Sequence, residues 1–239
     1  MPVRIAVPKE LVSGERRVAL DPTMTERFAK LGAEILIEKS AGLSAFFADD
    51  SYTKSSRLVD GAAALYAEAD VVLKVQPPSL EEAELLKDGT ILLGILQPHR
   101  NPELVKCLLA KNITSFAMEL IPRISRAQSM DVLSSQAAVA GYKVALLAAN
   151  LCSGFFPMLT TAAGTIRPSK VVIVGAGVAG LQAIATCRRL GAMVEAYDIR
   201  PAARQEVESL GAKMIDTGVS AAGEGGYARE LTTEEKQKQ

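Results

Sequence analysis

The sequence lacks tryptophan, has few other aromatic residues and carries no excess of charge of either sign. Its 239 residues include 27 Lys and Arg against 27 Asp and Glu, and 5% of them are aromatic. Balanced charge provides no global field to attract nucleic acid or anionic lipid. The shortage of aromatic rings disfavours a surface that stacks bases. We find no Ser-His-Asp, metal-ligand or Walker spacing, and so predict no bound metal.

Cysteine and membrane-targeting signals are also scarce. The three cysteines, Cys107, Cys152 and Cys187, are far apart and form no CxxC pair, which predicts buried apolar residues in a reducing compartment. The N-terminus begins directly with a strand-like run and has no signal-peptide stretch. Val144–Ile166 contains no charged residue and is long enough to span a bilayer. Its Asn, Gly, Pro, Ser and Thr residues favour a buried helix followed by a loop.

Apolar runs of strand length alternate with helical patterns along the chain, which predicts parallel sheets with crossover helices. We expect a first α/β domain over residues 1–131 and a connecting helix and loop over residues 132–168. The strands expected in the first domain are Arg4–Pro8, Glu34–Glu38, Val71–Val75, Ile91–Ile95 and Thr114–Ala117. The helices expected between them are Pro22–Leu31, Gly61–Ala67, Leu80–Leu85 and Pro102–Lys111. Asp21 and Asn101 each precede a proline, a pair typical of an N-cap with proline at the first helical position.

Residues 169–239 are expected to form the first half of a dinucleotide-binding domain. The expected elements are strand Val171–Val174, helix Val178–Leu190, strand Met193–Tyr197, helix Ala202–Leu210 and strand Ala212–Ile215. A doubly wound nucleotide fold needs two βαβαβ halves, and only the first is recognisable. The predicted fold class is therefore α/β, with two Rossmann-like parallel-sheet domains, the second incomplete.

The strongest motif is the glycine loop that follows the first strand of this second domain. Gly175, Ala176, Gly177, Val178 and Gly180 fit the GxGxxG fingerprint, and a helix opens within it. The first glycine permits a tight turn, the second lets the backbone approach a pyrophosphate, and the third allows close packing of helix and strand. The N-terminus of the helix offers N–H groups and a partial positive charge to the phosphates.

An acidic residue stands where this fingerprint requires one. Asp198 ends the second strand, where a carboxylate accepts hydrogen bonds from both ribose hydroxyls and repels a 2′-phosphate. Arg200 lies two residues further on and softens that exclusion. The unit is therefore predicted to prefer NAD(H) to NADP(H).

Three other features allow two interpretations each. Arg123–Asp131 follows the fifth strand of the first domain, where open α/β sheets bind ligands, but a solvated charged loop has the same composition. Lys74 lies in an otherwise apolar strand; it either meets a substrate carboxylate or reaches solvent from the strand end. His99, between Pro98 and Arg100, is expected in a surface turn rather than as a catalytic base.

Several of these segments together resemble one known family. They are RIAVPKE and GERRVAL near the N-terminus, VVLKVQPP, IPRISRAQSMDVLSSQAAVAGYK, and VVIVGAGVAGLQAIATCRRLGA followed by YDIRPAAR. Over essentially the whole chain, they resemble the NAD(H)-binding domain of the alpha subunit of proton-translocating (Re/Si-specific) NAD(P) transhydrogenases. The PRISRAQSMD stretch is the most specific element. Alanine dehydrogenases are similar in fold and share the RVAL and LKV motifs.

The resemblance implies an activity, partners and a location. In that family the domain binds NADH and passes hydride directly to NADP⁺ on a separate domain, coupled to proton movement through a membrane domain. It therefore implies an NADP(H)-binding partner domain, a membrane domain, a homodimer, and a cytoplasmic position peripheral to the inner membrane. Direct hydride transfer requires positioning and exclusion of water, but no general acid or base.

The resemblance also assigns residues. Arg123, Gln128, Asp131 and Ser134 would hold the nicotinamide and its ribose, and Gln128 would face the NADP(H) domain. Asp198, Ile199 and Arg200 would hold the adenosine ribose, together with the pyrophosphate on the glycines. Gly226 would begin a mobile loop that closes over the nucleotide. The complete set of expected cofactor contacts is Arg123, Ile124, Ser125, Gln128, Ser129, Met130, Asp131, Ser134, Gly175, Ala176, Gly177, Val178, Gly180, Asp198, Ile199, Arg200, Gly226 and Gln239, of which Arg123, Gln128 and Asp131 would also serve the hydride transfer.

Two alternatives stay open. The first is an alanine dehydrogenase-like enzyme, since Arg17 and Lys74 resemble that family's pyruvate-binding pair. Such an enzyme needs a proton-transfer group, and Gln97 stands where alanine dehydrogenases have a histidine. The second is a non-catalytic NAD-binding remnant or sensor, because the second half of the nucleotide fold is missing. The family domain runs on for well over a hundred more residues.

Overall fold

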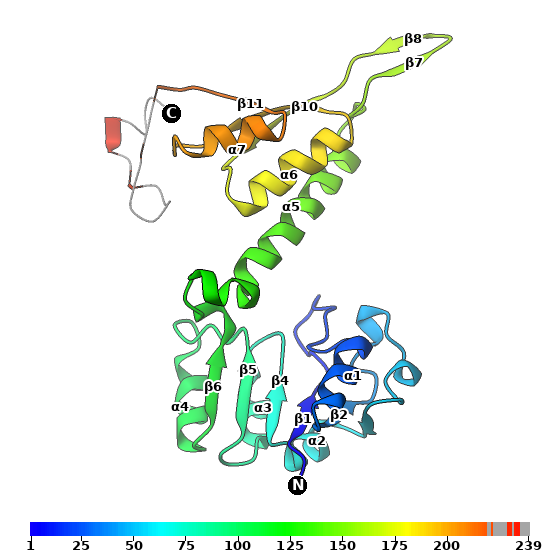
Figure 1. Cartoon of the computed structure of the whole chain (residues 1–239), viewed down its shortest axis with the longest axis vertical. Coiled ribbons are helices and arrows are strands. Elements are labelled where there is room, and N and C mark those ends of the chain that lie inside the picture. The colour runs from blue at the N-terminus through cyan, green and yellow to red at the C-terminus, as the bar shows by residue number, and fades with distance from the viewer. Residues whose placement is uncertain (219–220, 222–228, 231, 235–239) are drawn as a thin grey trace. The chain divides into compact units, whose positions relative to one another are not determined.

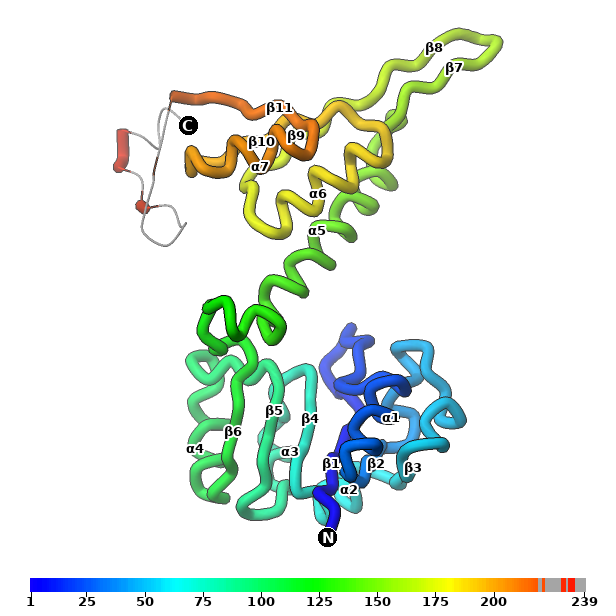
Figure 2. Tube along the Cα trace, viewed as in Figure 1, coloured from blue at the N-terminus to red at the C-terminus, as the bar shows by residue number. Residues whose placement is uncertain are grey.

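The computed structural model describes residues 1–218, 221, 229–230 and 232–234. The chain divides into two compact units, Met1–Asp131 and Val132–Gln239. Both are drawn in Figure 1, and Figure 2 follows the same chain as a trace. The units are described separately below.

The first unit is built on a six-stranded, entirely parallel sheet in the order β3-β2-β1-β4-β5-β6. Its strands are β1 (Arg4–Val7), β2 (Glu34–Glu38), β3 (Arg57–Val59), β4 (Val71–Leu73), β5 (Ile91–Gly94) and β6 (Thr114–Ala117). The order reverses between β1 and β4, so this unit is doubly wound. The carboxyl ends of β1 and β4 therefore flank its topological switch point.

Four helices connect these strands. They are α1 (Pro22–Lys30), α2 (Ala62–Glu68), α3 (Leu80–Leu85) and α4 (Pro102–Ala110). The Asp21 side chain accepts a hydrogen bond from the Met24 amide at 2.8 Å and caps α1, as predicted. Asn101 is the N-cap residue of α4, but its side chain donates to the carbonyls of Leu96 and Gln97 instead of capping the helix.

The sheet has a hydrophobic core on each face. Alternate strand residues such as Ala6, Leu36 and Leu92 pack with α2, α3 and α4. Residues one position away, such as Val7 and Ile37, pack with α1 and the Ala41–Tyr52 segment. This pattern explains the near-continuous apolar runs of β1 and β2, since strands covered on both faces need apolar residues at every position.

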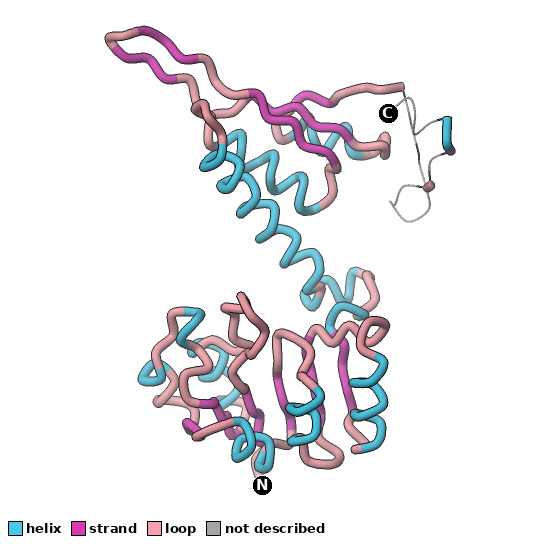
Figure 3. The backbone as a smooth tube through the Cα atoms, turned by 180° about the vertical axis from the view of Figure 1, so that it is seen from behind, coloured by secondary structure: helices cyan, strands magenta, loops and turns pink. Residues whose placement is uncertain are grey.

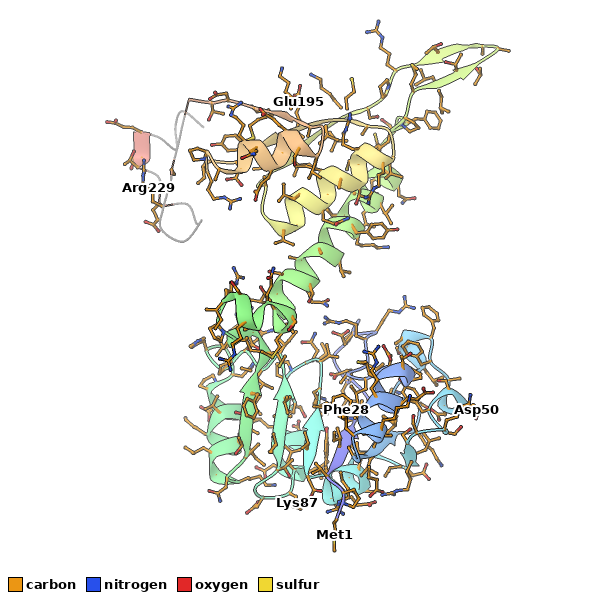
Figure 4. The ribbon with its side chains drawn as sticks, in the orientation of Figure 1. Met1, Phe28, Asp50, Lys87, Glu195 and Arg229 are labelled. Carbon is orange, nitrogen blue, oxygen red and sulfur yellow. The ribbon has the colours of Figure 1, made fainter. Side chains whose placement is uncertain are left out.

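The second unit contains a helix, a hairpin and a three-stranded parallel sheet. The helix is α5 (Val132–Leu151), and the hairpin, visible in Figure 3, is β7 (Leu159–Thr161) with β8 (Gly164–Ile166). The remaining elements are β9 (Lys170–Val174), α6 (Val178–Arg189), β10 (Met193–Tyr197), α7 (Ala203–Ser209) and β11 (Lys213–Met214). The sheet has the order β11-β10-β9, and α6 and α7 lie on one face of it (Figure 1). Glu195 lies on the opposite face (Figure 4).

Helix α5 packs against α6 through small residues. A Cβ atom added to Gly141 would lie 2.1 Å from the Ala179 carbonyl oxygen, so only glycine allows this approach. Ala145 is also buried there. Among the described residues, α5 is the one helix long and apolar enough to cross a membrane by length and composition, which is weak evidence for a span. Such helices also occur in the cores of soluble proteins.

The structure differs from the sequence expectations at three places. β3 and the β7–β8 hairpin were not predicted, because β3 is three residues long and the hairpin lies in a Thr- and Ala-rich run without alternation. The prediction that all three cysteines are buried is wrong for Cys152, which is exposed. A hydrogen bond from the Gly154 backbone lowers the pKa of the Cys152 thiol. Cys187 is buried, as expected.

Candidate nucleotide-binding site

The glycine loop joins β9 to α6, and its three glycines are required for different reasons. Gly175 has a φ of 94°, a conformation that L side chains rarely adopt. A Cβ atom on Gly180 would lie 1.8 Å from the Gly175 carbonyl oxygen, so this glycine lets the first turn of α6 pack on the loop. Gly177 has an ordinary φ of −77°, and a Cβ atom there would meet no protein atom within 4 Å.

The protein itself thus provides a reason for Gly175 and Gly180, but none for Gly177. A glycine without an internal reason fits a position that a ligand approaches closely, as the second glycine of the fingerprint does toward a pyrophosphate. Gly177 is the N-cap of α6 and has no side chain to cap the helix. The first amides of the helix are therefore oriented as in known phosphate sites. These observations fit a dinucleotide.

Asp198 lies immediately after β10 and is hydrogen-bonded to the glycine loop. Its Oδ2 accepts from the Ala176 amide at 2.7 Å, and its Oδ1 accepts from the Arg200 amide at 2.8 Å. The Arg200 guanidinium donates to both oxygens, Nε to Oδ1 and Nη2 to Oδ2, each at 2.9 Å. Nη2 also donates to the Ala176 carbonyl at 3.1 Å. The residues that the fingerprint predicts for the loop and for the ribose are therefore brought together.

The charge state of Asp198 follows from this environment. Burial alone would raise the pKa of the Asp198 carboxyl, but the hydrogen bonds from Arg200 and Ala176 outweigh it, so the pKa lies below its usual value. The carboxylate in turn raises the pKa of the Arg200 guanidinium. Both groups are charged at neutral pH, and Asp198 is available as an acceptor for hydroxyl donors.

A pocket of about 250 Å³ opens beside Asp198, at the carboxyl ends of β10 and β11. Ile199 and Arg200 line it, together with Tyr197 and Thr217. Within the part of the chain that the structure describes, Tyr197 Oη and Thr217 Oγ1 are the two buried side-chain atoms without a hydrogen-bond partner. Buried hydroxyls without a partner are costly, and a ligand with polar edges, such as an adenosine, would satisfy them. Tyr197 and Thr217 are not among the sequence-predicted contacts, although Tyr197 directly precedes Asp198.

The predicted nicotinamide loop lies at the end of the first unit. Ser125, Gln128, Ser129 and Met130 belong to a 3₁₀ segment, Ser125–Met130, which Arg123 and Ile124 precede and Asp131 follows. All of these are exposed except the half-buried Asp131. Ser134 lies in the first turn of α5, in the second unit. Gly226 and Gln239, predicted as further cofactor contacts, lie outside the described residues, as does the Gly225–Tyr227 stretch.

Lys74 neither reaches solvent nor presents its amine to a cleft, and the strand-end expectation is therefore wrong. Its side chain is 1% exposed, and Nζ donates to Glu82 Oε1 at 2.6 Å. Glu10 Oε2 lies 3.7 Å from Nζ on the other side. The Tyr66 hydroxyl donates to the same Glu82 oxygen at 3.0 Å, and the nearby carboxylates raise its pKa in addition to burial, which is the main cause. We call Glu10, Tyr66, Lys74 and Glu82 the Lys74 cluster.

The Lys74 cluster fills the switch point of the first sheet. Glu10 follows β1, Lys74 follows β4, and their carboxyl ends flank the crevice in which open α/β sheets bind ligands. Glu10 is fixed there because its Oε1 accepts from the Val75 amide at 2.6 Å. Among the described residues, no glycine loop follows β1, in contrast to β9. The second unit, not the first, therefore provides the nucleotide fingerprint.

Arg17 is paired at the edge of this crevice. Its guanidinium donates to Glu15 Oε1 at 2.8 Å and to Oε2 at 2.6 Å, and these bonds lower the pKa of Glu15 to about 2. His99 is exposed in the turn between β5 and α4, as predicted. Gln97, which precedes this turn, has a φ of 48°, and its amide donates to Glu119 at 2.6 Å.

No metal centre is indicated among the described residues, because no three His, Cys, Asp or Glu side chains are grouped so as to hold an ion. A larger pocket of about 570 Å³ lies beside β6 and α4 in the first unit. Its lining is apolar apart from Ser115 and includes Phe116, Leu104 and Met130. This pocket contains no titratable side chain, and so it offers no group for acid–base chemistry.

Comparisons with known proteins agree with this geometry. Residues 6–140 match the family model described as "Alanine dehydrogenase/PNT, N-terminal domain", and residues 144–238 match "Alanine dehydrogenase/PNT, C-terminal domain". The chain is 44% identical over 247 residues to the first portion of the NAD(P) transhydrogenase alpha subunit of Rhodospirillum rubrum, a separate polypeptide, covering 99% of this chain and 64% of that relative. The chain therefore spans less than two thirds of the length of this relative.

Solved structures give the same result. The transhydrogenase from Sinorhizobium meliloti superimposes with a TM-score of 0.87 at 45% identity, over 90% of this chain and 64% of that one. An L-alanine dehydrogenase superimposes with a TM-score of 0.79 at 27% identity, over 90% of this chain and 62% of that one. Both the α/β fold class and the resemblance found in the sequence are confirmed.

Proposed function

The chain belongs to the alanine dehydrogenase/PNT family, and we propose that it is the NAD(H)-binding component of a proton-translocating NAD(P) transhydrogenase. Family membership supports NAD(H) as the cofactor, and similarity to transhydrogenase alpha subunits supports an oxidoreductase of this type. The proposal adds direct hydride transfer to NADP(H) bound on a partner domain, coupled to proton translocation. The chain spans 64% of the relative's length, so the activity of the whole protein belongs to the proposal.

The observation that carries the proposal is the joined arrangement of the glycine loop and Asp198. Gly177 leaves open space for a pyrophosphate, while the Ala176 amide holds the Asp198 carboxylate at 2.7 Å. A carboxylate at this position favours a ribose diol over a 2′-phosphate. We propose that Gly175, Ala176, Gly177, Val178 and Gly180 hold the pyrophosphate, and that Asp198, Ile199 and Arg200 hold the adenosine ribose.

The nicotinamide end is proposed to lie against the Arg123–Asp131 loop and Ser134. NAD(H) supplies the hydride, and the chain supplies orientation and exclusion of water. Arg123, Gln128 and Asp131 provide donors and acceptors for the carboxamide and ribose hydroxyls, and Gln128 faces the NADP(H) domain. No proton has to move to or from a protein group in such a transfer. The lack of a histidine at Gln97 and the exposed position of His99 are consistent with this requirement.

The Lys74 cluster argues against an alanine dehydrogenase, the second candidate from the same family. That reaction needs cationic groups for a substrate carboxylate and a proton-transfer group at the reacting carbon. The Lys74 amine already lies 2.6 Å from Glu82, and Arg17 is paired with Glu15. NAD⁺-dependent conversion of alanine to pyruvate by the purified chain would establish this second candidate.

The proposed partners follow from the same relatives. We propose that the chain works beside an NADP(H)-binding domain and a membrane domain, as a homodimer, and that it is peripheral to the inner membrane on the cytoplasmic side. Some relatives are named as alpha subunits, and the one from Rhodospirillum rubrum is named as only the first portion of such a subunit. These names support an assembly of several polypeptides or domains.

A transfer assay tests the proposal directly. The chain is mixed with the NADP(H)-binding partner, and reduction of an NAD⁺ analogue by NADPH is followed by absorbance. We expect analogue reduction that depends on both proteins. No transfer under conditions in which both nucleotides are bound would contradict the proposed function. NADH binding without transfer would favour the non-catalytic, NAD-sensing alternative.

Replacing Asp198 with alanine should weaken NADH binding by about 1–3 kcal/mol, the usual cost of leaving buried hydrogen-bonding groups without a partner. The Ala176 amide and the ribose hydroxyls would lose their acceptor. Titration with NADH, read by nicotinamide fluorescence, measures the effect. Asp216→Ala is the matched control, since Asp216 lines the same pocket but is 72% exposed. Equal affinities of the Asp198 variant and the unmodified chain would show that the ribose binds elsewhere.

A further inference from the structure

All acceptor positions of the Asp198 carboxylate are used by N–H donors of the chain itself. An ionised carboxylate has about four lone-pair positions. Ala176 N and Arg200 Nη2 donate to Oδ2 at 2.7 and 2.9 Å, and Arg200 N and Nε donate to Oδ1 at 2.8 and 2.9 Å. A ribose diol therefore reaches this carboxylate only if one or more of these donors leaves.

The four donors are of two kinds. The Ala176 and Arg200 amides belong to the backbone of the glycine loop and of the turn after β10, so the fold fixes them. The other two donors belong to the Arg200 guanidinium, on a side chain that is 27% exposed and ends in rotatable bonds. A ribose diol brings two O–H donors, the same number that the guanidinium contributes. Exchange of one pair for the other leaves Asp198 fully hydrogen-bonded.

We propose that Arg200 is a specificity-determining gate: its guanidinium holds the two carboxylate positions that the ribose hydroxyls of NADH require, and it leaves them when NADH binds. This inference deepens the proposed function and rests on it. The closed Arg200–Asp198 pair also neutralises the carboxylate. NADPH, whose 2′-phosphate cannot donate as a hydroxyl does, leaves the pair closed and meets a weaker repulsion than a bare carboxylate would exert.

Arg200 also links the gate to the phosphate end of the site. Its Nη2 donates to the Ala176 carbonyl at 3.1 Å, within the glycine loop itself. Opening the gate therefore releases one contact on the ribose acceptor and one on the loop that receives the pyrophosphate. Ribose and pyrophosphate binding are coupled through a single side chain.

Removing the guanidinium should then change the two nucleotide affinities in opposite directions. In Arg200→Met, the ribose no longer has to displace an ion pair, and NADH affinity should rise by about threefold to tenfold, because part-exposed pairs of this kind contribute on the order of 1 kcal/mol. NADPH affinity should fall, because Asp198 is no longer neutralised. The ratio of the two dissociation constants is the decisive quantity.

The test is a titration of the purified chain and its variants with NADH and NADPH, followed by nicotinamide fluorescence. Arg204→Met is the matched control: Arg204 lines the same pocket but pairs with Asp216 at 3.1 Å and Glu208 at 3.5 Å. We expect the preference for NADH to increase in Arg200→Met and to stay unchanged in Arg204→Met. An Arg200 variant that binds NADH more weakly with an unchanged preference would overturn the gate and make Arg200 a simple contact.

A second measurement uses the unmodified chain. The Nε–H resonance of Arg200, assigned by its loss in Arg200→Met, should be protected from exchange with water and should lose this protection on addition of NADH but not of NADPH. Protection that persists in the NADH complex would overturn the gate while leaving the proposed function intact. A failure of both the unmodified chain and the variant to bind NADH would contradict the proposed function, and the gate with it.

Discussion

Replacing Gly180 with alanine is expected to abolish NADH binding and to destabilise the second unit. The added Cβ atom would lie 1.8 Å from the carbonyl oxygen of Gly175 and 2.8 Å from its carbonyl carbon. Both are backbone atoms of the glycine loop, so relief requires α6 to move away from β9. Overpacking of this kind costs about 1–3 kcal/mol or more. It also separates the N-terminus of α6 from the Asp198 carboxylate that the loop holds.

The matched variant, Gly177→Ala, should keep the fold and lose only the binding. Its Cβ atom would meet no protein atom within 4 Å, and the φ of −77° suits any residue. Alanine is a poorer N-cap than glycine, so we expect a loss of stability of about 1 kcal/mol at most. NADH affinity should fall by about tenfold or more, because the methyl group occupies the approach of the pyrophosphate.

Hydrogen exchange by mass spectrometry distinguishes the two variants. Peptides from β9 and α6 should exchange faster in Gly180→Ala and at nearly the original rate in Gly177→Ala. An NADH titration of each variant gives the binding half of the comparison. If Gly177→Ala bound NADH as the unmodified chain does, the pyrophosphate would not lie on this loop. If Gly180→Ala showed normal exchange, the close approach of α6 to Gly175 would be wrong.

The glycine loop could be predicted because its chemistry is local in the sequence. Strand, turn, helix and acidic residue follow one another within Lys170–Asp198, and each has a residue pattern of its own. The same holds for the start of α1, where Asp21 and Pro22 indicate the N-cap. The doubly wound topology of the first unit also follows from the alternation of strands and helices, since parallel strands require crossover connections.

The Lys74 cluster could not be predicted, because its members are distant in the sequence and meet only in the folded sheet. Lys74 follows β4, Glu82 lies in α3, and Glu10 follows β1, 64 positions before Lys74. A lysine in an apolar strand indicates only that its charge needs a partner. Arg200 is a similar case: its proximity to Asp198 is visible in the sequence, but its bidentate hold on that carboxylate is not.

Replacing Lys74 with methionine is expected to destabilise the first unit by about 3–5 kcal/mol, the usual cost of removing one partner of a buried ion pair. Methionine fills most of the same volume, so the loss is one of charge rather than of packing. The carboxylates of Glu10 and Glu82, which are 3% and 7% exposed, would then lie buried near each other without a cation. Urea unfolding, with hydrogen exchange in β1 and β4 as the local probe, measures the change.

Two further variants separate this explanation from the alternatives. Lys87→Met is the surface control: Lys87 pairs with Asp70 at 3.0 Å, but both side chains are more than a third exposed, and such pairs contribute about 1 kcal/mol or less. In Lys74→Met/Glu82→Leu the uncompensated charge is largely removed, and most of the lost stability should return. This double variant also bears on function. If Lys74 serves only to neutralise the switch point of the first sheet, the double variant should bind NADH and support hydride transfer as the unmodified chain does. A folded double variant that has lost transfer would instead require Lys74 to take part in the reaction, as the alanine dehydrogenase alternative demands.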